Sequence, residues 1–263
     1  MKTKLTNKIY EILFFGISIS FLFACSITRT YTAHSPELSS KSNDAGQITL
    51  GGSYSTGTNK YCVENDYYGH YADPRKVSTN FEYYSANARI GIAKGLDFGI
   101  DYTFKENQNP YISNTSYQSG NVLATKSKLQ QSYWLNAKYQ FVNKDMKPGK
   151  PVIAIGLTQG FATGFDQGNT ICITSIPFMF GVAINQTDLV QLTTKYEIVD
   201  YNTDSYTRWC LGLGGDVALF KVIENGIALK LKPRVGYIMD FAHNNDSSSW
   251  YYNLGISIDI KPE

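Results

Sequence analysis

Hydrophobic and polar residues alternate with a period of two over long stretches of this chain. In the segment GLDFGIDYTFK, residues 95–105, one side of such a pattern carries Phe98 and Ile100. The other side carries Asp97 and Asp101. This alternation is typical of a β-strand with one apolar and one polar face, and it does not fit the period of a helix. The pattern alone leaves open whether the apolar face packs into a soluble core or faces lipid.

About ten segments of this kind follow one another, separated by turn-forming residues, with no convincing helix between them. Most are about ten residues or longer, against a usual five to six in globular proteins, and that length suits a tilted strand that crosses a bilayer. The predicted strands are 47–56, 79–93, 95–105, 128–142, 151–162, 171–184, 188–199, 206–219, 226–238 and 249–260.

The connections between these strands alternate between long and short. Residues 57–78 and 106–127 are long, whereas Lys94 and the NQT segment form tight turns. Outer-membrane barrels show this rhythm because every second connection is an outer loop and the others are short periplasmic turns. We therefore predict an all-β fold, a single antiparallel up-and-down β-barrel of about ten strands of the outer-membrane type. Its apolar face would contact lipid, and both ends of the barrel domain would lie on the periplasmic side.

The first residues are typical of an export signal. Lys2, Lys4 and Lys8 precede the apolar run ILFFGISISFLFA, which is too short to span a bilayer as a helix. We predict a signal peptide over residues 1–24. The sequence LFAC resembles the lipobox of bacterial lipoproteins, which implies acylation of Cys25, with palmitate among the acyl chains. The alternative is an ordinary signal peptide that happens to end near a cysteine.

Residues 25–46 are polar, rich in Ser and Thr, and show no apolar periodicity. They are predicted to form a flexible, lipidated tether, followed by the barrel domain at 47–263. Ser26 resembles the residue after the cysteine in lipoproteins that are sent to the outer membrane. The expected location is the bacterial outer membrane, with the lipid-anchored N-terminus on the periplasmic side.

Composition changes this picture little. Twenty tyrosines, 22 glycines and 14% aromatic residues favour strands and turns. The net charge of +2, without a run of basic residues interleaved with aromatics, argues against a nucleic-acid partner. Over nearly all of the chain after the tether, the alternation and connection rhythm resemble those of small outer-membrane β-barrel proteins. The resemblance implies outer-membrane lipid as a partner and outer loops that present to a surface ligand or protein, with no cofactor.

The polar faces of the predicted strands carry nearly balanced charges. Asp216 is expected opposite Lys230, and Arg89 close to Asp101, so ion pairs across neighbouring strands are predicted. Barrels of eight to ten strands are filled by side chains, so a wide pore is disfavoured, and the interior should prefer anions wherever it is open. The predicted lumen charges are Arg89, Asp97, Asp101, Lys138, Lys195, Asp216, Lys230, Lys232 and Arg234.

Residues suited to catalysis are scarce. His70 and His243 lie in the first and last predicted outer loops, each near aspartates. Their residue types, though not their spacing, resemble the Asp and His groups at the rim of omptin proteases, where a carboxylate-oriented imidazole could activate water. The expectation is that the protein is not an enzyme. The aspartates concerned are Asp66, Asp73, Asp240 and Asp246.

Three cysteines remain after Cys25, namely Cys62, Cys172 and Cys210. An exported chain meets an oxidising compartment, so one disulfide between loops is a reasonable expectation, although the sequence cannot assign the pair. No metal site is expected, because no two cysteines share a ligand-like spacing with a histidine.

Three functional hypotheses follow from these observations. The first is a lipid-tethered outer-membrane barrel, structural or surface-presenting, with a side-chain-filled lumen. The second is a periplasmic, lipid-anchored soluble β-barrel that buries its apolar face and binds an apolar small molecule. The third is a hydrolase with its site at the rim. Pro177 and Pro233 fall inside predicted strands, where each needs a bulge or a local break.

Overall fold

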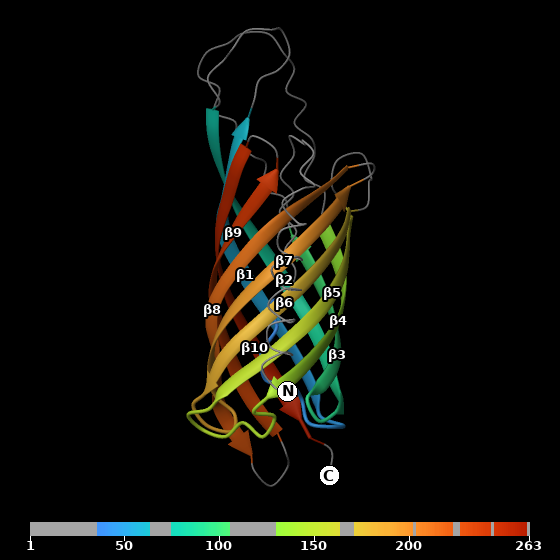
Figure 1. The fold of residues 1–263 in the computed structure, drawn as a ribbon, viewed down its shortest axis with the longest axis vertical. Coiled ribbons are helices and arrows are strands. Elements are labelled where there is room, and N and C mark those ends of the chain that lie inside the picture. The colour runs from blue at the N-terminus through green and yellow to red at the C-terminus, as the bar shows by residue number, and fades with distance from the viewer. Residues whose placement is uncertain are drawn as a thin grey trace, which may run out of the picture.

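The computed structural model describes residues 36–63, 75–105, 130–163, 171–201, 204–222, 227–242 and 245–261 of the 263-residue chain. Within them lie ten antiparallel strands that form one closed barrel, tilted against its long axis (Figure 1). The strands are β1 (Ile48–Val63), β2 (Arg75–Ala93), β3 (Leu96–Lys105), β4 (Gln130–Val142), β5 (Pro151–Thr163), β6 (Ile171–Ala183), β7 (Leu189–Tyr201), β8 (Asp204–Val222), β9 (Ile227–Ala242) and β10 (Asn245–Ile260).

Each strand pairs with the next along the chain, and β1 pairs with β10 to close the sheet. The predicted number and order of strands is confirmed, but several strands extend further than the alternation indicated. The β1–β2 ladder continues beyond Thr56 to the pair Val63 and Arg75. Backbone hydrogen bonding does not require an alternating side-chain pattern, so polar strand ends stay paired where the apolar face has ended.

The apolar face of the barrel is its outer face. Phe98 and Ile100 on β3 are 47% and 59% exposed, whereas Asp97 and Asp101 on the same strand are 3% and 5% exposed. This arrangement confirms the outer-membrane type of barrel, which has an apolar exterior and a polar interior. The alternative of a soluble barrel that buries its apolar face is wrong, because these aspartates occupy the interior.

Aromatic rings form a band on the outer face. Tyr84 stacks on Phe104 with ring centroids 5.3 Å apart, and Tyr102 lies 5.1 Å from Tyr133. Further around the same side of the sheet, beyond β1, β9 and β10 contribute Tyr237 and Trp250, 4.6 Å apart. Amphipathic rings at this position suit the boundary between hydrocarbon and head groups of a bilayer.

One end of the barrel carries the short turns and is called the short-turn end below. Ile48 of β1 pairs with both Ile90 of β2 and Ile260 of β10, so the first strand begins and the last strand ends there, beside the turn at Lys94 and Gly95. The described residues include no helix that is long and apolar enough to cross a membrane.

The two strand prolines lie at breaks in the ladders, as expected. Pro177 falls in a gap of the β5–β6 ladder, between the pairs of Phe178 and Ser175. Pro233 pairs with Leu254 of β10 but falls in a gap of the β8–β9 ladder. Proline has no N–H to donate, so a closed barrel accommodates it only where one ladder is interrupted.

Candidate functional site

An extended segment of the chain, residues 36–47, lies inside the barrel and is called the lumenal segment. It leaves β1 at the short-turn end, where Gly46 N donates to Gly91 O and Gly91 N donates to Gln47 O, both at 2.9 Å. From there it rises to Pro36, whose carbonyl accepts a hydrogen bond of 3.4 Å from Lys195 Nζ, halfway along β7. The segment therefore occupies the half of the lumen next to the short turns.

The prediction of a flexible tether over residues 25–46 is wrong for residues 36–46. Leu38, Ser40 and Ser42 are buried, and their backbone groups are bonded to the barrel wall. The composition of this stretch resembles a linker, but the lumen holds it by hydrogen bonds, an ion pair and the packing of Leu38. Residues 25–35, including Cys25, lie outside the described residues.

The side chain of Gln191 on β7 makes the hydrogen bonds to the lumenal segment that the backbone of a neighbouring strand would make. Its side-chain oxygen accepts a hydrogen bond of 2.6 Å from Ser40 N, and its amide nitrogen donates one of 2.7 Å to Leu38 O. The carboxamide thus satisfies one donor and one acceptor of an extended backbone, as a paired β-strand would. Buried backbone groups need such partners, because an orphaned group retains its desolvation penalty.

Strand β4 supplies two more attachments. Gln140 accepts a hydrogen bond of 2.7 Å from Ser42 N. The Nζ atom of Lys138 donates to Ser39 O at 2.8 Å and to Lys41 O at 2.5 Å, and it lies 3.1 Å from Asp97 Oδ2. The ammonium group, which has three donors, is therefore fully used on a carboxylate and two backbone carbonyls.

The wall is also shaped to receive the segment. Leu38 packs with Ala154 and Met179 in one of several small apolar clusters inside the barrel. A Cβ atom added to Gly91 would lie 1.9 Å from Asp44 O, and one added to Gly181 would lie 2.7 Å from Ser40 Oγ. The absence of these side chains lets the segment approach the barrel backbone closely.

The side chains on the opposite side of the lumenal segment enter ion pairs and hydrogen bonds. Glu37 Oε1 lies 2.5 Å from Lys195 Nζ and accepts a hydrogen bond of 2.5 Å from the hydroxyl of Tyr251. Ser39 Oγ donates to Asp216 at 2.6 Å, and the other carboxylate oxygen of Asp216 lies 2.5 Å from Arg234. The segment is thus bound on both of its sides.

All nine charged residues predicted for the lumen lie on its wall. Arg89 pairs with Asp101 at 3.2 Å, as expected, but Asp216 pairs with Arg234 and not with Lys230. Lys230 pairs with Asp259 instead, at 2.5 Å. The expectation for Asp216 failed because the β8–β9 ladder places Ala218, and not Asp216, opposite Lys230. The nine residues are Arg89, Asp97, Asp101, Lys138, Lys195, Asp216, Lys230, Lys232 and Arg234.

Two of the three cysteines expected to contribute a disulfide have described side chains, and both are free thiols. Cys210 is buried on the lumen side of β8, whereas Cys172 is partly exposed on β6. Cys62 belongs to β1, and its side chain lies outside the described residues.

The suggested rim site falls outside the described part of the chain. His70, Asp66, Asp73 and His243 lie outside the described residues, as do the side chains of Asp240 and Asp246. Among the residues that are described, no group of three His, Cys, Asp or Glu side chains could hold a metal ion. The site that the structure does define is the lumen and its segment.

Sequence comparison reveals no relatives: no protein-family model matches the chain, and no curated protein matches it significantly. Several solved barrels are similar in strand arrangement. They include the outer-membrane protease OmpT from Escherichia coli, at 9% identity over 84% of this chain and 99% of that chain, with a TM-score of 0.42. The β-domain of the Bordetella autotransporter BrkA matches at 12% identity over 83% and 100% of the two chains, with a TM-score of 0.43. Ail, the attachment invasion locus protein of Yersinia pestis, matches at 7% identity over 81% and 99%, with a TM-score of 0.24. At these values the likenesses carry no information on activity.

Proposed function

We propose that this chain is a non-enzymatic outer-membrane β-barrel lipoprotein whose lumen is closed by its own lumenal segment and whose outer connections present to a surface ligand or protein. The observation that carries the proposal is the fit of the lumenal segment. Gln191 matches the backbone of Leu38 and Ser40, and Gly91 and Gly181 leave the room that the segment fills. A lumen occupied in this way suits an anchor or a presenting scaffold better than a diffusion pore.

Location in the outer membrane is supported by the apolar outer face and its aromatic band. In cells, the Cys25→Ser variant should lose its acyl chains yet stay in the outer membrane, because ten amphipathic strands hold it there. The Ile100→Arg variant places a charge on the lipid face and should cost roughly 2 to 4 kcal/mol, whereas Asp97→Asn should leave the lipid face unchanged. Recovery of folded Cys25→Ser protein in the soluble periplasmic fraction would contradict the membrane location.

Closure of the lumen is tested by conductance in planar bilayers. The wild-type protein should show little or no conductance. The double variant Gln140→Leu/Gln191→Leu removes three hydrogen bonds to the lumenal segment and should give small, intermittent channels. Asn253→Leu is the matched control, because Asn253 is a lumen amide that donates to Ser53 and Ser55 of β1 instead. Large, stable channels in the wild type would overturn the proposal.

The outer connections are the part of the chain available for presentation. Residues 64–74 and 106–129 link strands at the end opposite the short turns, the first with three Tyr and the second with four Asn and two Tyr. Such side chains suit contacts that combine hydrogen bonds with apolar area. Replacing residues 106–129 by a short Gly-Ser linker should abolish binding of the protein to its surface partner while leaving barrel assembly intact.

The path of the lumenal segment supports a proposal for the side of the membrane on which an acylated Cys25 would lie. The segment rises from the short-turn end to Pro36, and Cys25 precedes Pro36 by 11 residues. Eleven extended residues span at most roughly 36 to 40 Å, enough to leave the lumen at the loop end. This course favours an anchor at the cell surface over the periplasmic side suggested by the connection pattern. An epitope inserted after Ser26 should then bind antibody on intact cells, and labelling only after permeabilisation would contradict it.

A further inference from the structure

Between the lumenal segment and the strands β9, β10, β1 and β2 lies a cavity of about 100 Å³. These four strands are called the cavity wall. Small residues lie side by side across it, since Gly255 of β10 pairs with Ser53 of β1, which pairs with Ser85 of β2. A Cβ atom added to Gly255 would meet its nearest neighbour at 3.4 Å, an ordinary contact. The hollow is large enough for several water molecules or for one tetrahedral oxyanion.

The charges around this cavity do not cancel. Seven basic and five acidic side chains line it. Each of the five carboxylates has its own cation: Glu37 pairs with Lys195, Asp97 with Lys138, Asp101 with Arg89, Asp216 with Arg234 and Asp259 with Lys230. Two lysines of the lining, Lys41 and Lys232, have no carboxylate within ion-pair distance in the described part of the chain.

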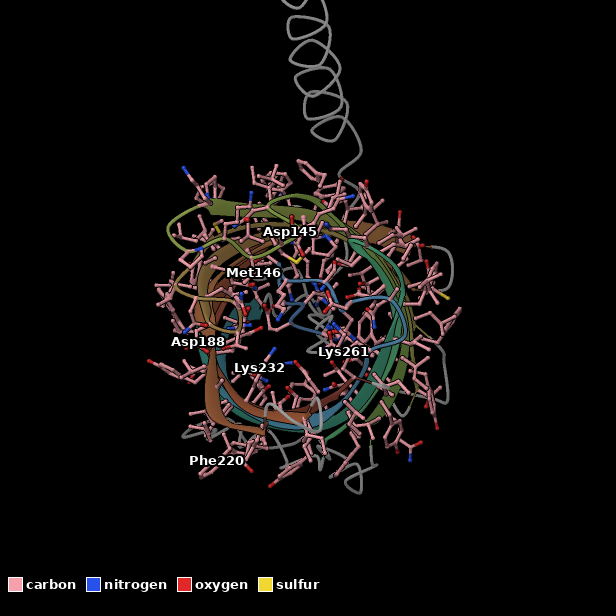
Figure 2. All side chains as sticks on the ribbon, turned by 90° about the horizontal axis from the view of Figure 1, so that it is seen from below. Asp145, Met146, Asp188, Phe220, Lys232 and Lys261 are labelled. Carbon is pink, nitrogen blue, oxygen red and sulfur yellow. The ribbon has the colours of Figure 1, made fainter. Side chains whose placement is uncertain are left out.

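The two remaining lysines differ in what they contact. Lys41 Nζ donates to the carbonyl of Gln186 at 3.0 Å, at the short-turn end. Lys232 makes no hydrogen bond or ion pair with any described residue, and it points into the interior of the barrel (Figure 2). Lys232 is partly exposed, and an ammonium group that loses part of its water is stabilised by a counter-charge. Lys232 therefore lacks an anion.

A second, independent observation concerns Ser257 of β10. This residue lines the same cavity and is 2% exposed, yet its hydroxyl has no hydrogen-bond partner among the described residues. Ser257 is directly across the ladder from Lys230, one step along the wall from the pair of Lys232 and Gly255. A free hydroxyl donor thus lines the same part of the lumen as the unpaired ammonium group.

We propose that this cavity is a binding site for a small inorganic oxyanion of the phosphate type. Lys232 supplies the pairing charge and Ser257 a hydroxyl donor, while the positive field of Arg89 and Lys230 adds to the attraction. The cavity wall provides room through its glycine and serines, and the lumenal segment forms the opposite side. Figure 2 shows the lumen from the short-turn end, with Lys232 labelled. Binding here does not depend on whether the lumen conducts or on the acylation of Cys25.

The test is equilibrium binding of inorganic phosphate to the purified full chain in detergent and phosphate-free buffer. One phosphate should bind per chain, and Lys232→Met should weaken binding by about tenfold or more, with Ser257→Ala intermediate. Lys232→Arg should retain binding, because it keeps the charge. Lys150→Met is the matched control, since Lys150 is an exposed lysine in the turn between β4 and β5.

Thermal unfolding supplies a second measurement that separates a site from a general salt effect. Lys232→Met removes an unpaired charge from the lumen, so the variant should fold, and without phosphate its unfolding temperature should equal or exceed that of the wild type. Millimolar phosphate should raise the unfolding temperature of the wild type and leave that of Lys232→Met unchanged. An equal rise in both proteins, or equal phosphate binding by both, or no binding by the wild type, would overturn the proposal.

Discussion

The two sides of the lumen differ in how their side chains contact the lumenal segment. The strands β4 to β7, called the holding wall, carry long polar side chains such as Lys138, Gln140 and Gln191, which reach the backbone of the lumenal segment. The cavity wall places glycine and serine beside a hollow, at Gly255, Ser53 and Ser85, and its basic side chains Arg89, Lys230 and Lys232 line that hollow. One side of the barrel thus makes most of the side-chain hydrogen bonds to the backbone of the segment, and the other leaves room beside it. The difference lies in what the side chains contact, since both walls carry long polar residues.

The largest effect is expected on the holding wall at Lys138. Lys138→Met leaves Asp97 as an unpaired buried carboxylate and removes the donor to two carbonyls of the lumenal segment. The free energy of unfolding should fall by about 3 to 5 kcal/mol, as is typical when one partner of a buried ion pair is removed. Urea unfolding followed by tryptophan fluorescence measures this loss.

Two further variants show whether the loss at Lys138 arises from the buried charge. Asp97→Asn combined with Lys138→Met should recover part of the lost stability, because no unpaired carboxylate remains. Lys150→Met, an exposed lysine, should leave stability unchanged within about 0.5 kcal/mol. A loss below 1 kcal/mol for Lys138→Met itself would show that the holding wall does not bind the segment as described.

The next effect is expected at Gln191. Gln191→Leu keeps the bulk of the side chain but leaves Leu38 O and Ser40 N without partners, so the free energy of unfolding should fall by about 2 to 4 kcal/mol. Hydrogen exchange of the Ser40 amide should become faster in the same variant. The matched change on the cavity wall, Asn253→Leu, should cost less, because it breaks only hydrogen bonds between side chains at Ser53 and Ser55. Equal losses in the two variants would remove the distinction between the walls.

Replacing one glycine by alanine on each wall compares the space that the two walls leave for a methyl group. Gly181→Ala on the holding wall brings a Cβ atom within 2.7 Å of Ser40 Oγ and 3.0 Å of Val190 O, and should destabilise the barrel by about 1 to 3 kcal/mol. Gly255→Ala on the cavity wall meets ordinary contacts and should be neutral or stabilising by up to about 1 kcal/mol. Thermal unfolding of both variants in one detergent gives the comparison. Destabilisation by Gly255→Ala would mean that the hollow is not there.

The smallest effect is expected outside both walls, at Asp188 in the turn between β6 and β7. Burial alone would raise the pKa of Asp188, but hydrogen bonds from Ala218 N at 2.8 Å and Asn185 Nδ2 at 2.6 Å outweigh it and hold that pKa below its usual range. A depressed carboxyl pKa stabilises the fold above the unfolded value, near pH 4, and the contribution is lost as the pH falls through the folded pKa. Solvent screening keeps the contribution below about 1 kcal/mol.

Unfolding of the wild type and of Asp188→Asn between pH 7 and pH 3 measures this contribution. The stability of the wild type should fall more than that of the variant over the acid part of this range, because the variant has no carboxyl to protonate. Parallel pH profiles in the two proteins would show that Asp188 does not hold the strand β8 at Ala218.

The sequence by itself determined the strands and the faces of the barrel. The alternation of Phe98 and Ile100 with Asp97 and Asp101 is local, and it recurs in several other strands, so closing the sheet turns their polar faces inward. Strands β5 and β6 instead turn mainly small or apolar residues inward, such as Ala154, Ile171 and Ile173. The positions of Pro177 and Pro233 likewise indicated where ladders break. Strand ends were less predictable, because backbone pairing continues past the residues that alternate.

Only the tertiary structure decided what fills the lumen. The partner of Ser40 is Gln191, 151 residues away, and the partner of Ser42 is Gln140, so the polar stretch that resembles a linker gains structure only when distant strands surround it. Register was decided in the same way. The β8–β9 ladder places Ala218 opposite Lys230, and the ion pairs then join Asp216 to Arg234 and Lys230 to Asp259. Local patterns fix which face a side chain joins, whereas hydrogen bonds and ion pairs across the lumen depend on where the closed barrel brings the side chains together.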